Sequence, residues 1–287
     1  MMDRYSMPTA VTKLNDRDND TLEKKPFKHS DWYNEGEQQT QSDIMRIICL
    51  GRTGAGKSSL GNTLLGQKWF KSKQSTKSVT EKCAVGNRLF KGIQMSVVDT
   101  PGLFDNKLSQ SECHKEIARC IQTVVPGPHA FLIVIRCDTR FTPEEKACII
   151  WIKEKFGEKA LDYCIVVMTH LDSVEKDDQT IEQFIKDGDE EIKELITKCG
   201  GRYCAVNNDA SAEEKDIVLI KLLQIISIMI KANDGKVFTN EMIRRLTKAL
   251  RRNKEAHGEY KMIEPDGTIN PLPEVEEEVA EYYQNHH

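Results

Sequence analysis

The chain has 287 residues with a formal net charge of −4, and 30% of its residues are charged. This length is enough for a packed core, and the near balance of charge argues against a partner such as nucleic acid, which would need a strongly basic surface. The nine cysteines are scattered without C-x-x-C pairs, which predicts reduced thiols in a cytoplasmic protein rather than a disulfide framework.

Residues 1–42 are polar and charged and show hardly any apolar periodicity. A segment of this kind buries too little apolar surface to fold, so we predict a disordered N-terminal segment. The first regular elements expected are a strand over residues 44–50, which form an apolar run, and a helix over residues 58–65, which have helical spacing.

The segment between that strand and that helix fits G-x-x-x-x-G-K-[ST], the pattern of a phosphate-binding loop; it reads Gly51-Arg52-Thr53-Gly54-Ala55-Gly56-Lys57-Ser58-Ser59. Glycine lets the backbone approach phosphate oxygens closely, and successive N–H groups at a helix N-terminus form a nest for anions. In this pattern Lys57 reaches the β- and γ-phosphates and the Ser58 hydroxyl binds Mg²⁺. The loop therefore predicts a site for a nucleotide with Mg²⁺.

Residues 67–80 are polar and rich in Lys and Ser, which is typical of a mobile loop. Either Ser72 or Thr80 could supply a hydroxyl that closes on Mg²⁺ and the γ-phosphate, and we favour Thr80 because it precedes the next strand. Strands are then expected over residues 81–90 and 93–98.

The second of these strands leads directly into Asp99-Thr100-Pro101-Gly102. In P-loop enzymes an acidic residue in this place supplies the second Mg²⁺ group, usually through water, which predicts that role for Asp99. Gly102 is a candidate sensor of the γ-phosphate, because its N–H is unobstructed and it lets the loop pivot. In small GTPases a glutamine after this glycine orients the attacking water. Here Leu103 takes that position, which predicts slow hydrolysis.

A helix is expected over residues 111–125 and a buried central strand over residues 130–135. The next helix is expected to begin at Pro143, with Thr142 as its N-cap and Glu145 completing a capping box. A second buried strand, over residues 163–168, follows that helix and delivers Thr169-His170-Leu171-Asp172.

This tetrapeptide predicts recognition of guanine. A carboxylate just past a strand end, such as that of Asp172, can accept hydrogen bonds from guanine N1–H and from the 2-amino group together, whereas adenine presents the opposite pattern. The site is thus expected to take GTP and GDP, and an ATP-dependent kinase or ATPase is disfavoured. An ordinary loop aspartate is the alternative. A last strand over residues 202–206 ends at Asn207 and Asn208, where side-chain or backbone groups could contact the base.

The rest of the chain is expected to be helical. Residues 177–199 form one or two charged amphipathic helices, and residues 217–230 form a buried helix that is too short to span a bilayer. Residues 238–254 combine an apolar stripe with a basic face, which fits a helix packed on the domain or one that lies peripherally on a membrane. We therefore predict four units: a disordered segment (1–42), a nucleotide-binding domain (43–232), an amphipathic helical extension (233–256) and an acidic flexible tail (257–287).

Taken together, these motifs resemble one family, the GTPases of immunity-associated proteins (GIMAP). The resemblance covers roughly residues 43–255 and rests on the phosphate loop, Asp99-Thr100-Pro101-Gly102-Leu103-Phe104-Asp105, Gly127-Pro128-His129-Ala130, Arg140-Phe141-Thr142-Pro143-Glu144-Glu145, Thr169-His170-Leu171-Asp172, Arg202-Tyr203-Cys204-Ala205-Val206-Asn207-Asn208 and Phe238-Thr239-Asn240-Glu241-Met242. It implies an α/β fold, a Ras-like P-loop G domain with a central, mostly parallel sheet flanked by helices and a C-terminal helical extension. It also implies Mg²⁺·GTP binding, slow hydrolysis, a role in immunity and GTP-dependent homodimers or homo-oligomers formed through the nucleotide face.

Arg140 and His129 are the two candidates for a catalytic role. The resemblance implies that Arg140 acts across a dimer as a catalytic arginine, and the alternative is a surface arginine. His129 lies at the entry to a buried strand, which favours a structural role over that of a catalytic base. The leading hypothesis is a GTP-switched scaffold, and the alternative is a nucleotide-loaded interaction module without significant turnover.

Overall fold

A computed structural model of the chain describes residues 44–72, 82–103, 109–257 and 263–286. The predictions for residues 1–42 and for Thr80 lie outside these ranges. At the centre is a sheet of six strands in the order β2-β3-β1-β4-β5-β6. The strands are β1 (Ile44–Leu50), β2 (Ala84–Phe90), β3 (Ile93–Asp99), β4 (Ala130–Arg136), β5 (Cys164–Thr169) and β6 (Tyr203–Val206).

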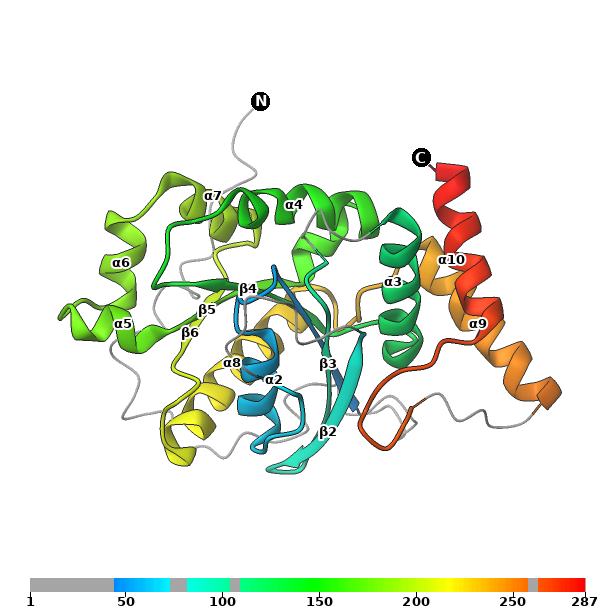
Figure 1. Cartoon of the computed structure of the whole chain (residues 1–287), viewed down its shortest axis with the longest axis horizontal. Helices are drawn as coiled ribbons and strands as arrows, with labels where there is room; N and C mark the ends of the chain where they lie inside the picture. The colour runs from blue at the N-terminus through cyan, green and yellow to red at the C-terminus, as the bar shows by residue number, and fades with distance from the viewer. Residues whose placement is uncertain (1–43, 73–81, 104–108, 258–262, 287) are drawn as a thin grey trace.

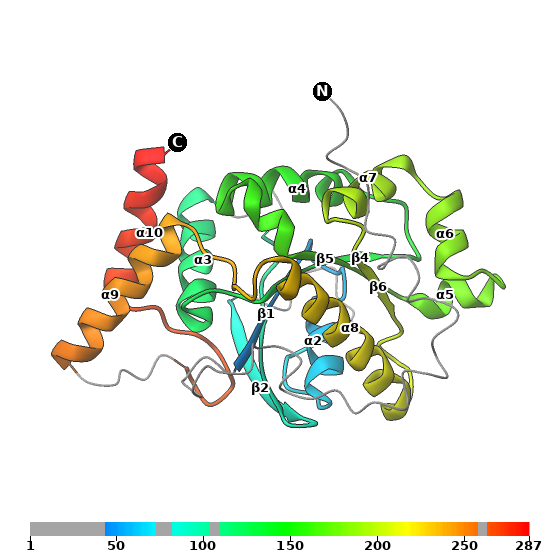
Figure 2. The same ribbon diagram turned by 180° about the vertical axis from the view of Figure 1, so that it is seen from behind.

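Helices cover both faces of this sheet (Figures 1 and 2). They are α2 (Lys57–Leu65), α3 (Gln110–Val124), α4 (Pro143–Phe156), the 3-10 helix η2 (Glu158–Tyr163), α5 (Leu171–Lys176), α6 (Ile181–Asp187), α7 (Glu190–Lys198), α8 (Ala212–Ala232), α9 (Glu241–His257) and α10 (Pro273–His286). One apolar core contains residues of α3, α4, α7 and α9, and the other contains residues of α2 and α8. The predicted α/β class with a C-terminal helical extension is confirmed.

The direction of the strands decides where a site can form. Only β2 runs antiparallel to its neighbour, while β3, β1, β4, β5 and β6 are parallel. Because parallel strands end at the same edge, the loops after β1, β3, β4, β5 and β6 gather there. β3 lies on one side of β1 and β4 lies on the other, so the order of the strands reverses at β1. Ligands bind at such a topological switch point in open α/β sheets.

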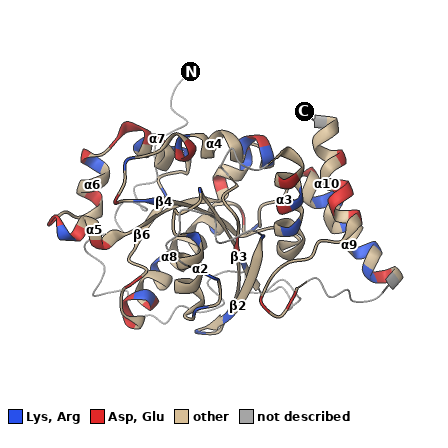
Figure 3. Cartoon of the chain, in the orientation of Figure 1, with Lys and Arg blue, Asp and Glu red and all other residues tan. Residues whose placement is uncertain are grey.

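Local sequence explains why the elements begin where they do. The strands β4 and β5 are buried along nearly their whole length, as expected for parallel strands covered on both faces. The predicted capping box of α4 is confirmed, with Thr142 and Glu145 bonded reciprocally and Pro143 in the first turn. Figure 3 shows charged residues gathered on the outer helices and loops, where water solvates them.

The C-terminal part differs from the predicted flexible tail. Val275 and Val279 are fully buried on α10, and Tyr283 is 2% exposed. The Tyr283 hydroxyl donates to the Lys155 carbonyl at 2.7 Å, and its ring stacks on His114 at 4.3 Å. The many glutamates concealed an apolar stripe at helical spacing, which packs against α3 and α9 and holds residues 273–286 as an ordered helix.

The basic helix α9 packs on the domain. Its apolar residues Met242, Ile243 and Leu246 are at most 1% exposed and belong to a core. Its basic residues lie beside the acidic α10, where Arg252 is 3.7 Å from Glu278. The apolar stripe is therefore used inside the protein. Among the described residues no helix is both long enough and apolar enough to cross a bilayer.

Candidate functional site

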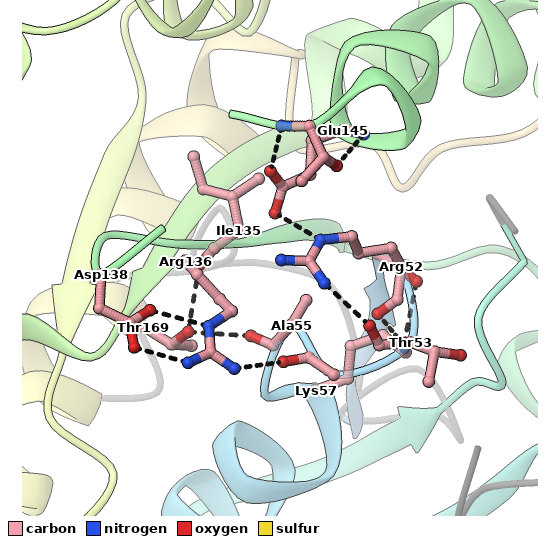
Figure 4. Close-up of polar contacts among 12 residues, drawn as sticks. Arg52, Thr53, Ala55, Lys57, Ile135, Arg136, Asp138, Glu145 and Thr169 are labelled. Carbon is pink, nitrogen blue, oxygen red and sulfur yellow. Dashed lines mark hydrogen bonds and ion pairs between the residues drawn. The ribbon is translucent and has the colours of Figure 1, made fainter. Parts of the chain in front are cut away.

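The predicted phosphate loop connects β1 to α2 at the carboxyl edge of the sheet (Figure 4). Two glycines are required by their surroundings. A Cβ on Gly51 would lie 2.6 Å from the Val134 carbonyl oxygen, and Gly56 has a φ of +93° with Thr169 side-chain atoms 3.1 Å from its would-be Cβ. The loop therefore lies directly on the ends of β4 and β5, where larger residues do not fit.

Lys57 lies beneath this loop and is 6% exposed. Its Nζ donates to the carbonyls of Gly51 and Arg52, both at 2.9 Å. The first N–H groups of α2 have no partner within the helix, and the positive end of the helix dipole adds to the lysine charge. These donors and this charge suit a phosphate group.

Two of the residues predicted to bind Mg²⁺, Ser58 and Asp99, meet in the structure, while the third, Thr80, lies outside the described residues. The Ser58 hydroxyl lies 2.6 Å from Oδ2 of Asp99, the last residue of β3, which is 1% exposed. Hydroxyl and carboxylate oxygens are the hard ligands that Mg²⁺ prefers, so the residues present fit this ion. In the described ranges no group of three or more His, Cys, Asp or Glu residues could hold a metal. A Mg²⁺ ion here would thus need phosphate oxygens and water to complete its shell.

Gly102 is buried after β3, and Leu103 next to it turns inward. Leu103 is 4% exposed and belongs to a core, while its N–H donates to the Pro101 carbonyl at 2.7 Å. The position that carries a glutamine in small GTPases is therefore filled by a side chain that packs away from solvent. The next residues, 104–108, lie outside the described ranges.

The residues of the predicted tetrapeptide, Thr169 to Asp172, lie in different surroundings: Thr169 ends β5, and Asp172 belongs to α5. Thr169 is fully buried, and its hydroxyl, which has one proton to donate, lies 2.8 Å from the Ala55 carbonyl oxygen and 3.1 Å from that of Ile135. Its side chain thus supports the phosphate loop from behind, and a contact of Thr169 with the nucleotide stays a prediction. His170, with a φ of +62°, and Leu171 then lead into α5.

Asp172 lies in the first turn of α5, and its side chain is 34% exposed. Lys176, whose Nζ is 2.9 Å away, holds the pKa of the Asp172 carboxyl below its usual value. The carboxylate is therefore ionised and accessible at the edge that carries the phosphate loop. That is the state in which it can accept two hydrogen bonds from one base.

The asparagines after β6 reach the same edge, but their side-chain oxygens are occupied. The Asn208 Oδ1 accepts from the Thr63 hydroxyl on α2 at 2.9 Å, and the Asn207 Oδ1 accepts from the Asp209 N–H at 2.9 Å. Asn208 thus ties β6 to α2. A contact with a base through other groups of either residue remains a prediction.

Other predicted residues lie further out. Ser72 is exposed, and its hydroxyl is 3.4 Å from Nδ2 of Asn62, more than a turn along α2 from the phosphate loop. Arg140 is exposed in the loop between β4 and α4, and none of its contacts with described residues is a hydrogen bond or an ion pair. An arginine of this kind can reach outward, which leaves its predicted role open.

Sequence reasoning missed two ionic contacts around the loop (Figure 4). Arg52 Nε is 3.1 Å from Oε1 of Glu145, whose side chain is 1% exposed, so the loop is tied to the first turn of α4. Arg136 at the end of β4 donates to the Gly54 carbonyl at 3.2 Å and pairs with Asp138. The capping-box pattern accounts for Glu145 without its ion pair, and no sequence pattern singles out Arg136.

His129 stands at the opposite end of β4 from this site and is 3% exposed. Its Nδ1 accepts from the backbone N–H of Arg46 at 3.0 Å, and the backbone N–H of His129 donates to the Arg46 carbonyl at 2.8 Å. Burial, with the nearby Arg46 charge, lowers the pKa of His129 to about 3. The predicted structural role is confirmed.

This pKa leads to a pH prediction. The unfolded chain binds a proton at His129 below its ordinary pKa of about 6.5, and the folded chain does not until about 3. The contribution of His129 to the free energy of unfolding is thus fully present above pH 6.5 and falls by about 1.4 kcal/mol for each unit that the pH drops below it, down to about pH 3. Between pH 6.5 and 5, urea unfolding should show about 2 kcal/mol more loss for the wild type than for His129→Asn, whose amide oxygen can still accept from Arg46. Equal losses in the two proteins would contradict this assignment.

The chain matches one family model and a set of named relatives. A family model described as AIG1 matches residues 45–257. The chain is 35% identical over 245 residues to Immune-associated nucleotide-binding protein 10 of Arabidopsis thaliana, covering 84% of this chain and 51% of that protein. It thus spans about half the length of this curated relative.

Solved structures share the fold. Toc33 from Arabidopsis thaliana in complex with Mg²⁺ and GMPPNP has a TM-score of 0.52 and 21% identity, over 66% of this chain and 85% of that one. A structure described with the statement that dimerization is important for the GTPase activity of chloroplast translocon components atToc33 and psToc159 has a TM-score of 0.52 and 19% identity, over 65% of this chain and 83% of that one. At such identities the likeness shows the fold alone.

Proposed function

The chain belongs to the AIG1 family, and from that premise we propose that it binds GTP and GDP with Mg²⁺ and acts as a slow nucleotide switch. Membership confirms the family resemblance seen in the sequence. We propose that residues 43–232 form the guanine-nucleotide domain. The observation that carries the proposal is the gathering of Lys57, Ser58, Asp99 and Asp172 at one edge of the sheet.

Each residue has a distinct task in this proposal. Lys57 and the N–H groups at the start of α2 bind the β- and γ-phosphates, and Asp172 binds the base. Ser58 and Asp99 hold Mg²⁺, which when bound neutralises phosphate charge. The 2.6 Å contact between them brings the two oxygens to one place.

Slow hydrolysis follows from the residue after Gly102. Leu103 can neither donate nor accept a hydrogen bond through its side chain, and it is packed in a core. No side chain at this position orients the attacking water, so an isolated copy of the chain retains its nucleotide as GTP for long periods. Turnover then depends on a group supplied from outside.

We propose that this group comes from a second copy of the chain, associated through the nucleotide face. The exposed Arg140 lies in the loop before α4, and α4 is tied to the phosphate loop by the Arg52–Glu145 pair. Support comes from chloroplast translocon components atToc33 and psToc159, for which dimerization is described as important for the GTPase activity. A nucleotide-loaded interaction module without turnover is the second candidate, favoured by the buried Leu103.

Turnover across a protein concentration series separates these candidates. A self-associating switch shows a rate per chain that rises with concentration, together with a larger mass in the GTP-loaded state. An interaction module shows a flat, negligible rate. An isolated-chain turnover of order 1 s⁻¹, the low end of the kinase range, would contradict the slow switch. Displacement of labelled GTP by ATP at equal concentration would contradict guanine selectivity.

A further inference from the structure

Arg136 bridges two loops of the site from the end of β4 (Figure 4). Its Nη1 donates to the Gly54 carbonyl in the phosphate loop at 3.2 Å. Its Nε and Nη2 bond the two carboxylate oxygens of Asp138 at 2.8 and 2.5 Å. A bidentate pair of this kind fixes the plane of the guanidinium and therefore the direction of the remaining donor.

The other end of this arrangement reaches the loop after β5. Asp138 Oδ2 lies 3.8 Å from Nδ1 of His170, two residues before Asp172. Backbone contacts set the spacing, because Arg136 is in register with Thr169 and the Cys137 N–H donates to the Thr169 carbonyl at 3.0 Å. Arg136, Asp138 and His170 thus form a row of side chains from the phosphate loop to the segment that precedes Asp172.

The contact with Gly54 has a consequence for the N–H groups of the loop. In a trans peptide the carbonyl and the following N–H point in opposite directions. Because Arg136 holds the Gly54 carbonyl, the Ala55 N–H points the opposite way, to the Arg52 carbonyl, which accepts it at 3.3 Å. Thr169 holds the Ala55 carbonyl in the same way, and this directs the Gly56 N–H.

We propose that Arg136, paired with Asp138, is a positioning residue that couples recognition of the base to recognition of the phosphates. It keeps the N–H groups of the phosphate loop in register with His170 and Asp172. With this link in place, a nucleotide satisfies both ends of the site at once. Without this link the two loops shift independently of each other. The hydrogen bond between Asp172 and the guanine 2-amino group then weakens most, because it depends most on direction. The inference rests on the proposed guanine-nucleotide function of this site.

The test measures affinities for GDP and for IDP, which lacks the 2-amino group, by competition against fluorescent GDP on the full chain. Arg136→Gln and Asp138→Asn each weaken GDP binding about tenfold, the worth of one charge-assisted hydrogen bond. The affinity ratio of GDP to IDP falls at least about threefold, because Asp172 no longer meets the 2-amino group in register. The double variant binds GDP about as tightly as either single variant, since both substitutions remove the same interaction.

Two results would overturn the coupling. One is an equal loss of GDP and IDP affinity, which would mark a merely structural role. The other is a double variant whose loss of GDP affinity equals the product of the losses in the two single variants.

Arg245→Gln serves as a matched control, because Arg245 is 38% exposed and bonds Glu241 on α9, away from the site. This variant should leave both affinities unchanged. If Arg136→Gln does not fold, Asp138→Asn tests the link from its other end. A wild-type chain that binds no GDP would refute the proposed function instead.

Discussion

Asp172→Asn is expected to weaken GDP binding by about 10²-fold and to transfer preference to xanthine nucleotides. The ionised carboxylate can accept from both N1–H and the 2-amino group of guanine. An amide in its place can accept from N1–H only, and its NH₂ group faces the 2-amino group donor to donor. Xanthine carries a carbonyl at that ring position, which the amide NH₂ can meet.

The measurement is competition of GDP and XDP against fluorescent GDP for the wild type, and against fluorescent XDP for the variant. Lys176→Gln is the control, because it removes the cation 2.9 Å from Asp172 and keeps both acceptor oxygens. It should preserve the order of GDP over XDP. If Asp172→Asn binds GDP as the wild type does, Asp172 does not contact the base and the site lacks guanine selectivity at this position.

Arg140→Ala is expected to lower the GTP turnover reached at high protein concentration by about 10³-fold, the lower end of the effect of an arginine supplied in trans. The physical reason is that charge accumulates on the phosphoryl oxygens in the transition state and a guanidinium can neutralise it. Arg140 can be redirected towards a partner at little cost, since it is exposed and makes no ion pair with described residues.

Complementation makes this prediction specific. Wild-type chain loaded with a non-hydrolysable GTP analogue should restore turnover to Arg140→Ala, because the partner copy supplies the arginine. Arg251→Ala is the control for loss of an exposed arginine, since Arg251 is 80% exposed on α9. Turnover by Arg140→Ala that rises with concentration as in the wild type would remove Arg140 from the reaction. A loss without rescue would place its action within its own chain.

The phosphate loop illustrates what could be predicted locally. Its glycines, lysine and serine occur within nine consecutive positions, and each is required by the conformation and chemistry of a single loop. The same holds for the capping box from Thr142 to Glu145, whose two hydrogen bonds join residues three apart. Apolar runs identified the buried strands because burial on both faces leaves no polar position.

Thr169 and α10 show contacts that sequence reasoning did not foresee. Thr169 occupies a motif position that suggests a ligand contact, yet its hydroxyl bonds Ala55, 114 positions away. The acidic composition of residues 257–287 concealed the apolar stripe of Val275, Val279 and Tyr283, whose partners lie on other helices. Neither contact could be inferred from neighbours in sequence, because each depends on how distant elements pack.

The sequence by itself determined the class of fold, the phosphate loop and the place of Asp172 just past a buried strand. These follow from periodicity and from motifs whose chemistry is local. Only the tertiary structure decided what holds the loop in shape. Arg52 reaches Glu145 across 93 positions and Arg136 reaches Gly54 across 82. Such pairs form because parallel strands end together at one edge of the sheet, which brings residues from separate crossovers within hydrogen-bonding distance.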